Sequence, residues 1–159
     1  MYEVNEITWQ EIKQVCEENL WPNRKDGIHP VQHWTWHMKD NFLGKDKQIL
    51  ETSVPTFFGI KIDNKIVCVN SVFVSNKKDS LLYFRSRGLW TDTKYRKQAL
   101  AKTILLHCME YAKQNGGDWI WTVPRKSAFS AYASVGFTKK SDWFDEAQFG
   151  PNCIASKYL

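Results

Sequence analysis

The sequence predicts a mixed α/β fold, in which an antiparallel meander is followed by a βαβ unit and helices cover both faces of a mixed sheet. Two observations predict it. Residues 56–90 are rich in Val, Ile and Phe, have the period of strands and are interrupted by short polar turns. A long amphipathic helix, a short apolar strand and a second helix then follow, which is the order of a βαβ unit.

Composition indicates one globular domain over residues 1–159, with 43% hydrophobic residues. No apolar stretch is long enough to span a membrane, and the first six residues lack the basic and apolar regions of a leader. We therefore expect a cytoplasmic protein without a membrane partner. The four cysteines have no paired spacing, which favours buried reduced thiols, and none lies in an electropositive turn that would activate a catalytic thiol.

The formal net charge of +5 favours an anionic partner. Charge alone does not distinguish a phosphate-rich cofactor from nucleic acid. The lysines and arginines are spread along the chain, without a long basic run or the aromatic-basic signature of an RNA-binding sheet. The sequence therefore predicts no nucleic-acid partner.

The first elements are a strand and a helix. Tyr2 to Ile7 alternates loosely and predicts a short strand. Thr8 and Glu11 have the spacing of a capping box, in which each side chain bonds a backbone N–H group at the start of a helix. Apolar residues then recur with helical spacing, so we expect a helix from Trp9 to Leu20 that ends before Pro22.

Residues 23–51 carry weaker signals. Pro30 could open a helix that ends at Gly44. On such a helix His33 and His37 would share one face, which is the spacing of two metal ligands. No third ligand stands at a conventional spacing, so surface or pocket histidines are the favoured interpretation and no metal site is predicted.

The meander is predicted from residue 55 onward. Thr56 to Ile62 and Lys65 to Val74 are rich in Val, Ile and Phe, and Asp63-Asn64 between them predicts a hairpin turn. The polar stretch Asn76 to Ser80 predicts a second turn. Leu81 to Trp90 then predicts a third strand of the meander.

The βαβ unit follows that strand. A helix near Leu100 carries apolar residues at helical spacing and ends at Asn115-Gly116-Gly117, where a left-handed cap can form. Asp118 to Val123 predicts a short, largely buried strand. Ser127 to Val135 predicts a second, shorter helix.

The segment from Leu89 to Ala101 predicts an anion site. It leads from a strand end through a basic turn into a helix, whose first N–H groups are unpaired and carry partial positive charge. Arg96 and Lys97 add full charges, and the short side chains of Ala99 and Ala101 allow a phosphate to approach the backbone. A solvent-exposed helix start is the alternative interpretation of these residues.

The pattern Arg-x-x-Ala-x-Ala of this turn resembles the phosphate-binding loop of the GNAT superfamily of N-acetyltransferases. That loop reads Arg/Gln-x-x-Gly-x-Gly/Ala and holds the pyrophosphate of acetyl-CoA; Ala99 stands at its first glycine. The segment from Ser127 to Phe137 resembles a second GNAT segment, in which a tyrosine precedes a Gly-Phe pair by four residues. Tyr132 and Gly136-Phe137 match it, and Ser127 stands where Asn is frequent. The resemblance extends from about Phe57 to Phe137.

The resemblance implies a GNAT-like fold, acetyl-CoA as co-substrate, and a set of cofactor-binding residues. Backbone groups of Leu89, Trp90 and Thr91 would pair with the pantetheine arm. The loop and helix start would hold the pyrophosphate, and the second segment adds a serine. These residues are Arg96, Lys97, Gln98, Ala99, Leu100, Ala101 and Ser127.

Tyr132 is the candidate catalytic residue. Acetyl transfer to an amine leaves a thiolate that needs a proton, and a phenol with a pKa near 10 is suited to supply it. We therefore predict Tyr132 as the general acid. The alternative is a core aromatic residue on an amphipathic helix.

The base stays open. Arg87 stands where some GNAT relatives place a glutamate, and a guanidinium cannot accept a proton at neutral pH. Ordered water is one alternative, assisted by a residue near the pocket. The candidates are Asp118, Glu51, His29, His33 and His37.

Arg85 and Arg87 are the candidate substrate-binding residues. Counting in twos along the strand places Tyr83, Arg85, Arg87 and Leu89 on one face. Two guanidinium groups on the acceptor side would suit an acceptor with a carboxylate or phosphate near its amine. Cross-strand pairing with acidic side chains is the alternative.

The sequence as a whole predicts an acetyl-CoA-dependent N-acetyltransferase acting on the primary amine of a small molecule, one with an anionic group. Two alternatives stay open: a protein amine as acceptor, and a non-catalytic CoA-binding or interaction module. A homodimer is compatible with the sequence.

Overall fold

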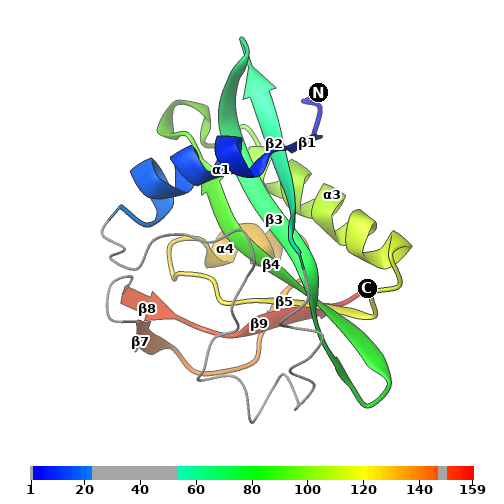
Figure 1. The fold of residues 1–159 in the computed structure, drawn as a ribbon. Coiled ribbons are helices and arrows are strands. Elements are labelled where there is room, and N and C mark those ends of the chain that lie inside the picture. Colours follow the sequence, from blue (N-terminus) through cyan, green and yellow to red (C-terminus); the bar gives the residue numbers. More distant parts are fainter. Residues whose placement is uncertain (1, 23–53, 147–149) are drawn as a thin grey trace.

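The computed structural model describes residues 2–22, 54–146 and 150–159, which form a seven-stranded mixed sheet with helices on both faces (Figure 1). The strands of this sheet lie in the order β1-β2-β3-β4-β5-β9-β6, and β7 pairs with β8 separately. The strands are β1 (Asn5–Ile7), β2 (Thr56–Ile62), β3 (Lys65–Lys78), β4 (Leu81–Thr91), β5 (Trp119–Thr122), β6 (Thr138–Lys139), β7 (Phe144–Glu146), β8 (Gly150–Asn152) and β9 (Ala155–Tyr158). The helical segments are α1 (Trp9–Val15), η1 (Cys16–Leu20), η3 (Thr93–Tyr95), α3 (Leu100–Gln114) and α4 (Phe129–Ser134). The predicted mixed α/β fold is confirmed.

Strands β1 to β4 form the predicted antiparallel meander. Two-residue turns, Asp63–Asn64 and Asp79–Ser80, connect β2 to β3 and β3 to β4, and all four residues have φ between 51° and 65°. Turns with both residues left-handed match the twist of paired strands, so two residues are enough to reverse the chain. The prediction of a turn from Asn76 onward is therefore wrong in extent, because β3 continues to Lys78.

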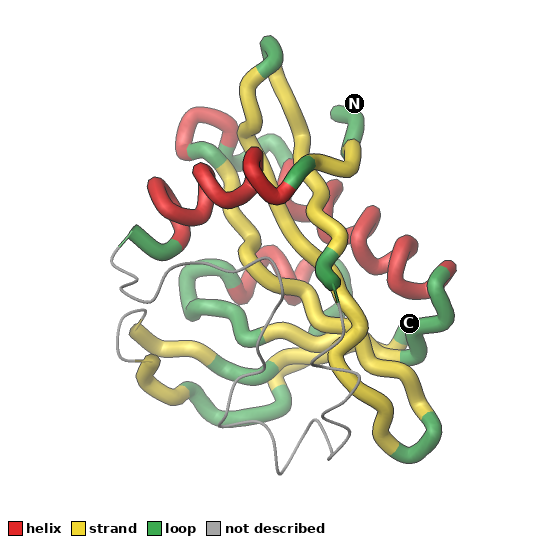
Figure 2. Tube along the Cα trace, viewed as in Figure 1, coloured by secondary structure: helices red, strands yellow, loops and turns green. Residues whose placement is uncertain are grey.

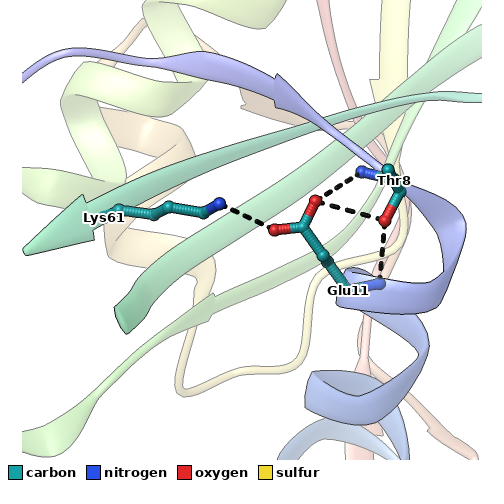
Figure 3. Close-up of polar contacts among 3 residues, drawn as sticks. All are labelled: Thr8, Glu11 and Lys61. Atoms are coloured by element: carbon teal, nitrogen blue, oxygen red, sulfur yellow. Dashed lines mark hydrogen bonds and ion pairs between the residues drawn. The ribbon is translucent and has the colours of Figure 1, made fainter. Parts of the chain in front are cut away.

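Helix α1 begins at the predicted capping box (Figure 3). The Thr8 hydroxyl accepts a hydrogen bond from the Glu11 backbone N–H at 3.2 Å, and the Glu11 carboxylate accepts one from the Thr8 N–H at 3.1 Å. Lys61 of β2 approaches the same carboxylate at 2.8 Å, which attaches the helix start to the sheet. The helix continues as the π-helical turn η1 and ends at Leu20, as predicted.

The helices cover opposite faces of the sheet, and Figure 2 shows α1 with η1 in front and α3 with α4 behind. On the front face α1 and η1 bury a small cluster built on Ile7, Ile12, Cys16, Leu20 and Val69. On the other face α3 and α4 bury the main core against the sheet. Its fully buried members include Ile60, Val67, Val72, Leu100, Ile104, Leu105 and Ile120. The expectation of helices on both faces is confirmed.

The βαβ unit consists of β4, α3 and β5, and its two strands are parallel as predicted. At the end of α3 the Asn115 N–H donates to the carbonyls of Tyr111, Ala112 and Lys113. The chain then turns through Gly116-Gly117 into β5. Strand β9 lies antiparallel between β5 and β6, and the sequence analysis did not predict it.

All four cysteines are buried and free, as expected. Burial raises the pKa of Cys68 to about 11 and raises the pKa of Cys108 further, so neither thiol is an activated nucleophile. Among the described residues no helix is long and apolar enough to cross a membrane.

Candidate active site

Strands β4 and β5 pair over three residues and then diverge (Figure 1). The last pair is Arg85 with Trp121; β5 ends at Thr122, whereas β4 continues to Thr91. Among the described residues, no strand pairs with β4 on this side beyond Arg85. We call the opening between Ser86–Thr91 and the end of β5 the β4–β5 gap. The β4 backbone groups that face it can pair with an extended ligand as an added strand would.

A β-bulge at Gly88 alters the faces of β4 within this gap. Ser71 of β3 lies opposite Arg87 and Val69 lies opposite Trp90, so β4 has one residue more than β3 over this stretch. Gly88 has φ of +78°, a backbone conformation that favours glycine. Because of the extra residue, the side chains after Gly88 lie on the face opposite to the one that regular alternation predicts.

Leu89 consequently packs in the main core on the α3 and α4 face, whereas Trp90 packs in the α1 cluster. The prediction that Leu89 shares a face with Arg85 and Arg87 is therefore wrong, because strict alternation ends at the bulge. The prediction that Arg85 and Arg87 share a face is supported, since both guanidinium groups stack on tryptophans that lie outside the main core.

The Tyr132 hydroxyl of α4 lies where β4 and β5 part. Its oxygen is 3.1 Å from the Ser86 hydroxyl, the first residue of β4 beyond the last β4–β5 pair. The Ser86 hydroxyl in turn donates to Asn70 Oδ1 of β3 at 2.8 Å. The phenol ring is 2% exposed and meets Phe137 edge-on at a centroid distance of 5.1 Å. Tyr132 is thus a core residue whose hydroxyl lies beside the gap.

The electrostatic environment keeps this phenol protonated. Burial raises the pKa of Tyr132, and hydrogen bonding with Ser86, Thr122 and Asn70 opposes that shift. Because the net shift is upward from an ordinary value near 10, the hydroxyl carries its proton at neutral pH. A general acid needs this state.

The predicted anion site lies at the end of β4. The Asp92 side chain accepts a hydrogen bond from the Lys94 N–H at 3.0 Å, which begins the single turn η3. The Arg96 Nε then donates to the Thr91 carbonyl at 3.2 Å, so that its guanidinium is held beside the last residue of β4. Lys97 has φ of +70°, which reverses the chain toward α3.

Helix α3 begins directly after this turn. Ala99, at its N-cap, has φ of 59° and no side chain that could accept from the first turn, so those N–H groups are left for a ligand. Arg96, Lys97, Gln98 and Ala99 are exposed. Gln98 accepts a hydrogen bond from the Tyr2 hydroxyl at 2.7 Å. The turn is exposed, and the start of α3 behind it has no side-chain cap.

Other predicted residues of the helix start differ in exposure. The Leu100 side chain is buried in the main core, so only the backbone of this residue can face a ligand. Ala101 is partly exposed on the first turn of α3. Ser127 is exposed in the turn that precedes α4.

The predicted arginines lie on the η1 face of the sheet. The Arg87 guanidinium lies over the Trp21 ring, 4.3 Å from its centroid, and is partly exposed. The Arg85 guanidinium lies over the Trp121 ring at 4.6 Å and is buried, with 6% exposure. Of the two arginine side chains, Arg87 is the more exposed.

Arg125, after β5, donates to the carbonyl of Leu20 at the end of η1. The end of η1 therefore contacts both sides of the β4–β5 gap, through Trp21 on Arg87 and through Leu20 on Arg125. The gap is bordered by α4 on one face of the sheet and by η1 on the other.

The sequence model of the acetyltransferase (GNAT) family matches residues 9–137. The chain belongs to the GNAT acetyltransferase family. It is an N-acetyltransferase whose acetyl donor is acetyl-CoA. None of the curated proteins compared with the sequence matches it.

Solved structures share the GNAT fold across the whole chain. An acetyltransferase of the GNAT family from Streptococcus pneumoniae matches with a TM-score of 0.67 at 12% identity, covering 100% of this chain and 99% of that one. The IAA acetyltransferase from Bacillus cereus matches with a TM-score of 0.63 at 11% identity, covering 100% of both chains. A chain of the NatC complex bound to Gag peptide and CoA matches with a TM-score of 0.66 at 12% identity, covering 99% and 98%.

The residues around the gap fit a GNAT co-substrate. The open edge of β4 suits the amides of the pantetheine arm, and the turn with Arg96 at the start of α3 suits the pyrophosphate. Sequence reasoning missed Asn70, Ser86 and Thr122 around Tyr132, and also Trp21 and Arg125. A polar residue within a strand carries no local signal of the partner it will meet.

Of the candidates for the general base, the structure describes Asp118. This residue lies just before β5, at the end of the strand opposite to Thr122. Its carboxylate accepts a hydrogen bond from the Leu82 N–H at 2.8 Å, which stabilises the turn before β5. The candidates Glu51, His29, His33 and His37, and the helix predicted around them, lie outside the described residues. Within the described residues no three His, Cys, Asp or Glu side chains could hold a metal ion.

Proposed function

We propose that the protein transfers the acetyl group of acetyl-CoA to the primary amine of a small molecule that carries an anionic group. The observation that supports it most is the Tyr132 hydroxyl, bonded to Ser86 at the β4–β5 gap. The acetyl donor follows from the family. The roles of individual residues and the kind of acceptor are our proposal.

The backbone of β4 and the turn after it hold acetyl-CoA in this proposal. Leu89, Trp90 and Thr91 pair with the pantetheine arm, and Arg96 with the start of α3 holds the pyrophosphate. The turn from Arg96 to Ala99 is exposed, so phosphates can reach both the guanidinium and the first N–H groups of α3. Ser127, in the turn before α4, completes the cofactor side.

Tyr132 acts as the general acid. When the acceptor nitrogen bonds to the acetyl carbon, the C–S bond breaks and its electron pair stays on sulfur. The Tyr132 hydroxyl gives its proton to that sulfur, which makes the thiol a better leaving group than the thiolate. A buried, protonated phenol beside the gap is suited to this task.

Arg87 selects the acceptor. Its guanidinium lies on the Trp21 ring and is partly exposed, and its positive charge suits a carboxylate or phosphate on the acceptor. Arg85 is buried with its guanidinium over the Trp121 ring, on the same face of β4. An anionic group on Arg87 would bring a neighbouring amine to the η1 side of the gap.

A test compares amines with and without a negative charge, such as free amino acids against their methyl esters, with release of CoA thiol as the readout. We expect transfer to the free acids with lower KM. Arg87→Ala should raise the acceptor KM for the acids alone by about tenfold or more. Arg96→Ala is the matched control, because it should raise the KM for acetyl-CoA and leave the acceptor KM unchanged.

Absence of transfer to any amine would contradict the proposal. Equal KM values for charged and neutral acceptors would contradict the role of Arg87. A protein amine is the second candidate, because a similar fold occurs in the NatC complex bound to Gag peptide and CoA. Peptides with free N-termini therefore belong in the same panel, and faster transfer to them would favour that candidate.

A further inference from the structure

The Tyr132 hydroxyl lies at a polar point inside an apolar core. Ser86 and Asn70 beside it are 1% and 0% exposed. Most side chains packed on this face of the sheet are apolar, among them Val72, Phe84, Leu105 and Ile120. Buried hydroxyl and amide groups destabilise a fold unless each is hydrogen-bonded, so apolar residues here would give a simpler core.

The hydrogen bonds around Tyr132 have a definite direction. Asn70 Nδ2 donates to the Arg87 carbonyl at 3.4 Å, so Asn70 Oδ1 faces Ser86 and accepts from it. The single proton of the Ser86 hydroxyl is thereby used, and Ser86 Oγ accepts from the Tyr132 hydroxyl. Three neighbouring elements, α4, β4 and β3, thus fix the direction in which the phenol proton points.

The Arg87 carbonyl at the end of this chain lies at the β-bulge. It accepts from the Ser71 hydroxyl at 2.7 Å as well as from Asn70. These side-chain bonds from β3 stabilise the bulge where the strand ladder is interrupted. The bulge and the Tyr132 hydroxyl are therefore linked through Asn70.

We propose that Ser86 and Asn70 are positioning residues, which hold the Tyr132 hydroxyl at the β4–β5 gap and stabilise the phenolate left after it gives its proton to sulfur. This inference rests on the proposed function, in which Tyr132 is the general acid. In the resting enzyme the Ser86 O–H points to Asn70 Oδ1 and the Tyr132 O–H points to Ser86 Oγ. For the transfer the Tyr132 O–H turns from Ser86 to the sulfur, and once its proton is given up the Ser86 O–H turns to the phenolate oxygen.

The proton balance is closed by the acceptor. Tyr132 gives one proton to sulfur, and the acceptor nitrogen loses one proton on becoming an amide. That proton returns through solvent to the phenolate, so that amine and acetyl-CoA give amide and CoA thiol. Ser86 and Asn70 change only the direction of a hydrogen bond and undergo no net reaction.

The groups that face the phenol come from every element packed around it. Besides Ser86 of β4 and Asn70 of β3, they are Thr122 of β5, which hydrogen-bonds to Tyr132, and the buried thiol of Cys108 on α3, which raises the pKa of Tyr132. No ordinarily charged side chain is among the groups that act on the phenol in the described residues. Its ionisation therefore depends mainly on burial and on these hydroxyl and amide groups.

A double-mutant cycle tests the inference, with the best acceptor from the amine panel. Tyr132→Phe should lower kcat by about 100-fold or more. Ser86→Ala should lower it by about tenfold, with little change in the KM for acetyl-CoA, and Ser86→Thr should restore most of the loss because it keeps a hydroxyl. In the Tyr132→Phe background, Ser86→Ala should have no further effect. Losses that multiply in the double variant, or an unchanged kcat in Ser86→Ala, would overturn the inference.

A titration without acceptor gives a second readout. Tyrosinate absorbance, taken as the difference between a variant and its Tyr132→Phe counterpart, reports the ionisation of Tyr132 alone. Ser86→Ala should raise the pKa of Tyr132, because the phenolate loses a donor; a loosened core that admits water would lower it instead. A lowered or unchanged pKa would overturn the role of Ser86.

These results separate the two proposals. If no amine is acetylated, the proposed function fails. If Tyr132→Phe keeps full turnover, the general-acid role fails, and the positioning role fails with it. If Tyr132→Phe loses turnover but Ser86→Ala and Asn70→Ala retain it, the general acid stands and the positioning role fails. Thermal unfolding of each variant shows whether a loss of kcat reflects a loss of fold.

Discussion

Replacing Ala99 by glycine should stabilise the protein, although the same change in a helix is usually destabilising. Ala99 has φ of 59°, and the left-handed conformation costs an L-residue about 1–2 kcal/mol. Glycine removes that cost, but it also gives the unfolded chain more conformational freedom, which lowers stability by about 0.4–1 kcal/mol. Because Ala99 is exposed, little packing is lost with its methyl group. The net expectation is a gain of about 0.5–1 kcal/mol.

Ala101, two residues later, supplies the matched control. It lies in the first turn of α3, where Ala→Gly costs about 0.5–1 kcal/mol. The two variants lose the same methyl group, yet their stabilities should differ from wild type in opposite directions. For 159 residues, an unfolding entropy of about 2.1 cal/mol/K per residue converts each effect into a shift in Tm of about 2–3 °C.

Thermal unfolding followed by circular dichroism measures the sign, and repeating it with acetyl-CoA measures the effect on binding. Ala99→Gly should bind acetyl-CoA at least as tightly as wild type, since it opens the backbone to a phosphate. A Tm of Ala99→Gly as low as that of Ala101→Gly would refute the left-handed cap. Weaker binding in Ala99→Gly would refute the placement of the pyrophosphate at this turn.

Four further predictions concern the turn at Arg96, the bulge at Gly88 and the start of α1. Arg96→Ala should weaken acetyl-CoA binding by about tenfold in calorimetric titration, because a charged hydrogen bond to phosphate is lost, and undiminished affinity would exclude it from the site. Gly88→Ala should destabilise the protein by about 1–2 kcal/mol in urea unfolding, because φ is +78° at the bulge; wild-type stability would contradict that geometry. Thr8→Ala should cost about 1 kcal/mol as the helix cap is lost, which the same assay measures. Lys61 and the capping bonds hold the pKa of Glu11 below its ordinary value. The stability that Glu11 contributes at neutral pH should therefore be lost as pH falls through its folded pKa. Glu11→Gln should make the free energy of unfolding depend less steeply on pH in the acid range.

Elements with local signals were predicted correctly from the sequence. The capping box at Thr8 needs only neighbouring residues, and the turn at Asp63–Asn64 needs only two residues that tolerate a left-handed backbone. Strand β9 has no such signal, because Ala155 and Ser156 are small and have little preference for strands. It is a strand because β5 and β6 pair with it on its two edges, an arrangement set by the tertiary fold.

The candidate site divides in the same way. The turn at Arg96 and the segment around Tyr132 are sequence patterns; the structure places Tyr132 where the parallel β4–β5 pair ends, and the turn at Arg96 after the end of β4. Ser86 meets Tyr132 across 46 residues of chain, and no local pattern predicts that contact. The face of Leu89 was predicted wrongly, yet a signal was present, since an isolated glycine within a strand, here Gly88, often marks a bulge.

The position of that bulge has a consequence for the chemistry. Up to Arg87 the strand alternates regularly, so Ser86 faces α4 and Arg87 faces η1. Ser86, which contacts the proposed proton donor Tyr132, and Arg87, the proposed acceptor-binding residue, are adjacent in β4 and therefore lie on opposite faces of the strand. In the proposed reaction the amine then approaches from the η1 face, while Tyr132 gives its proton from the α4 face. Tyr132 is poorly placed to serve as the base as well, and a residue or water that deprotonates the amine belongs on the η1 face.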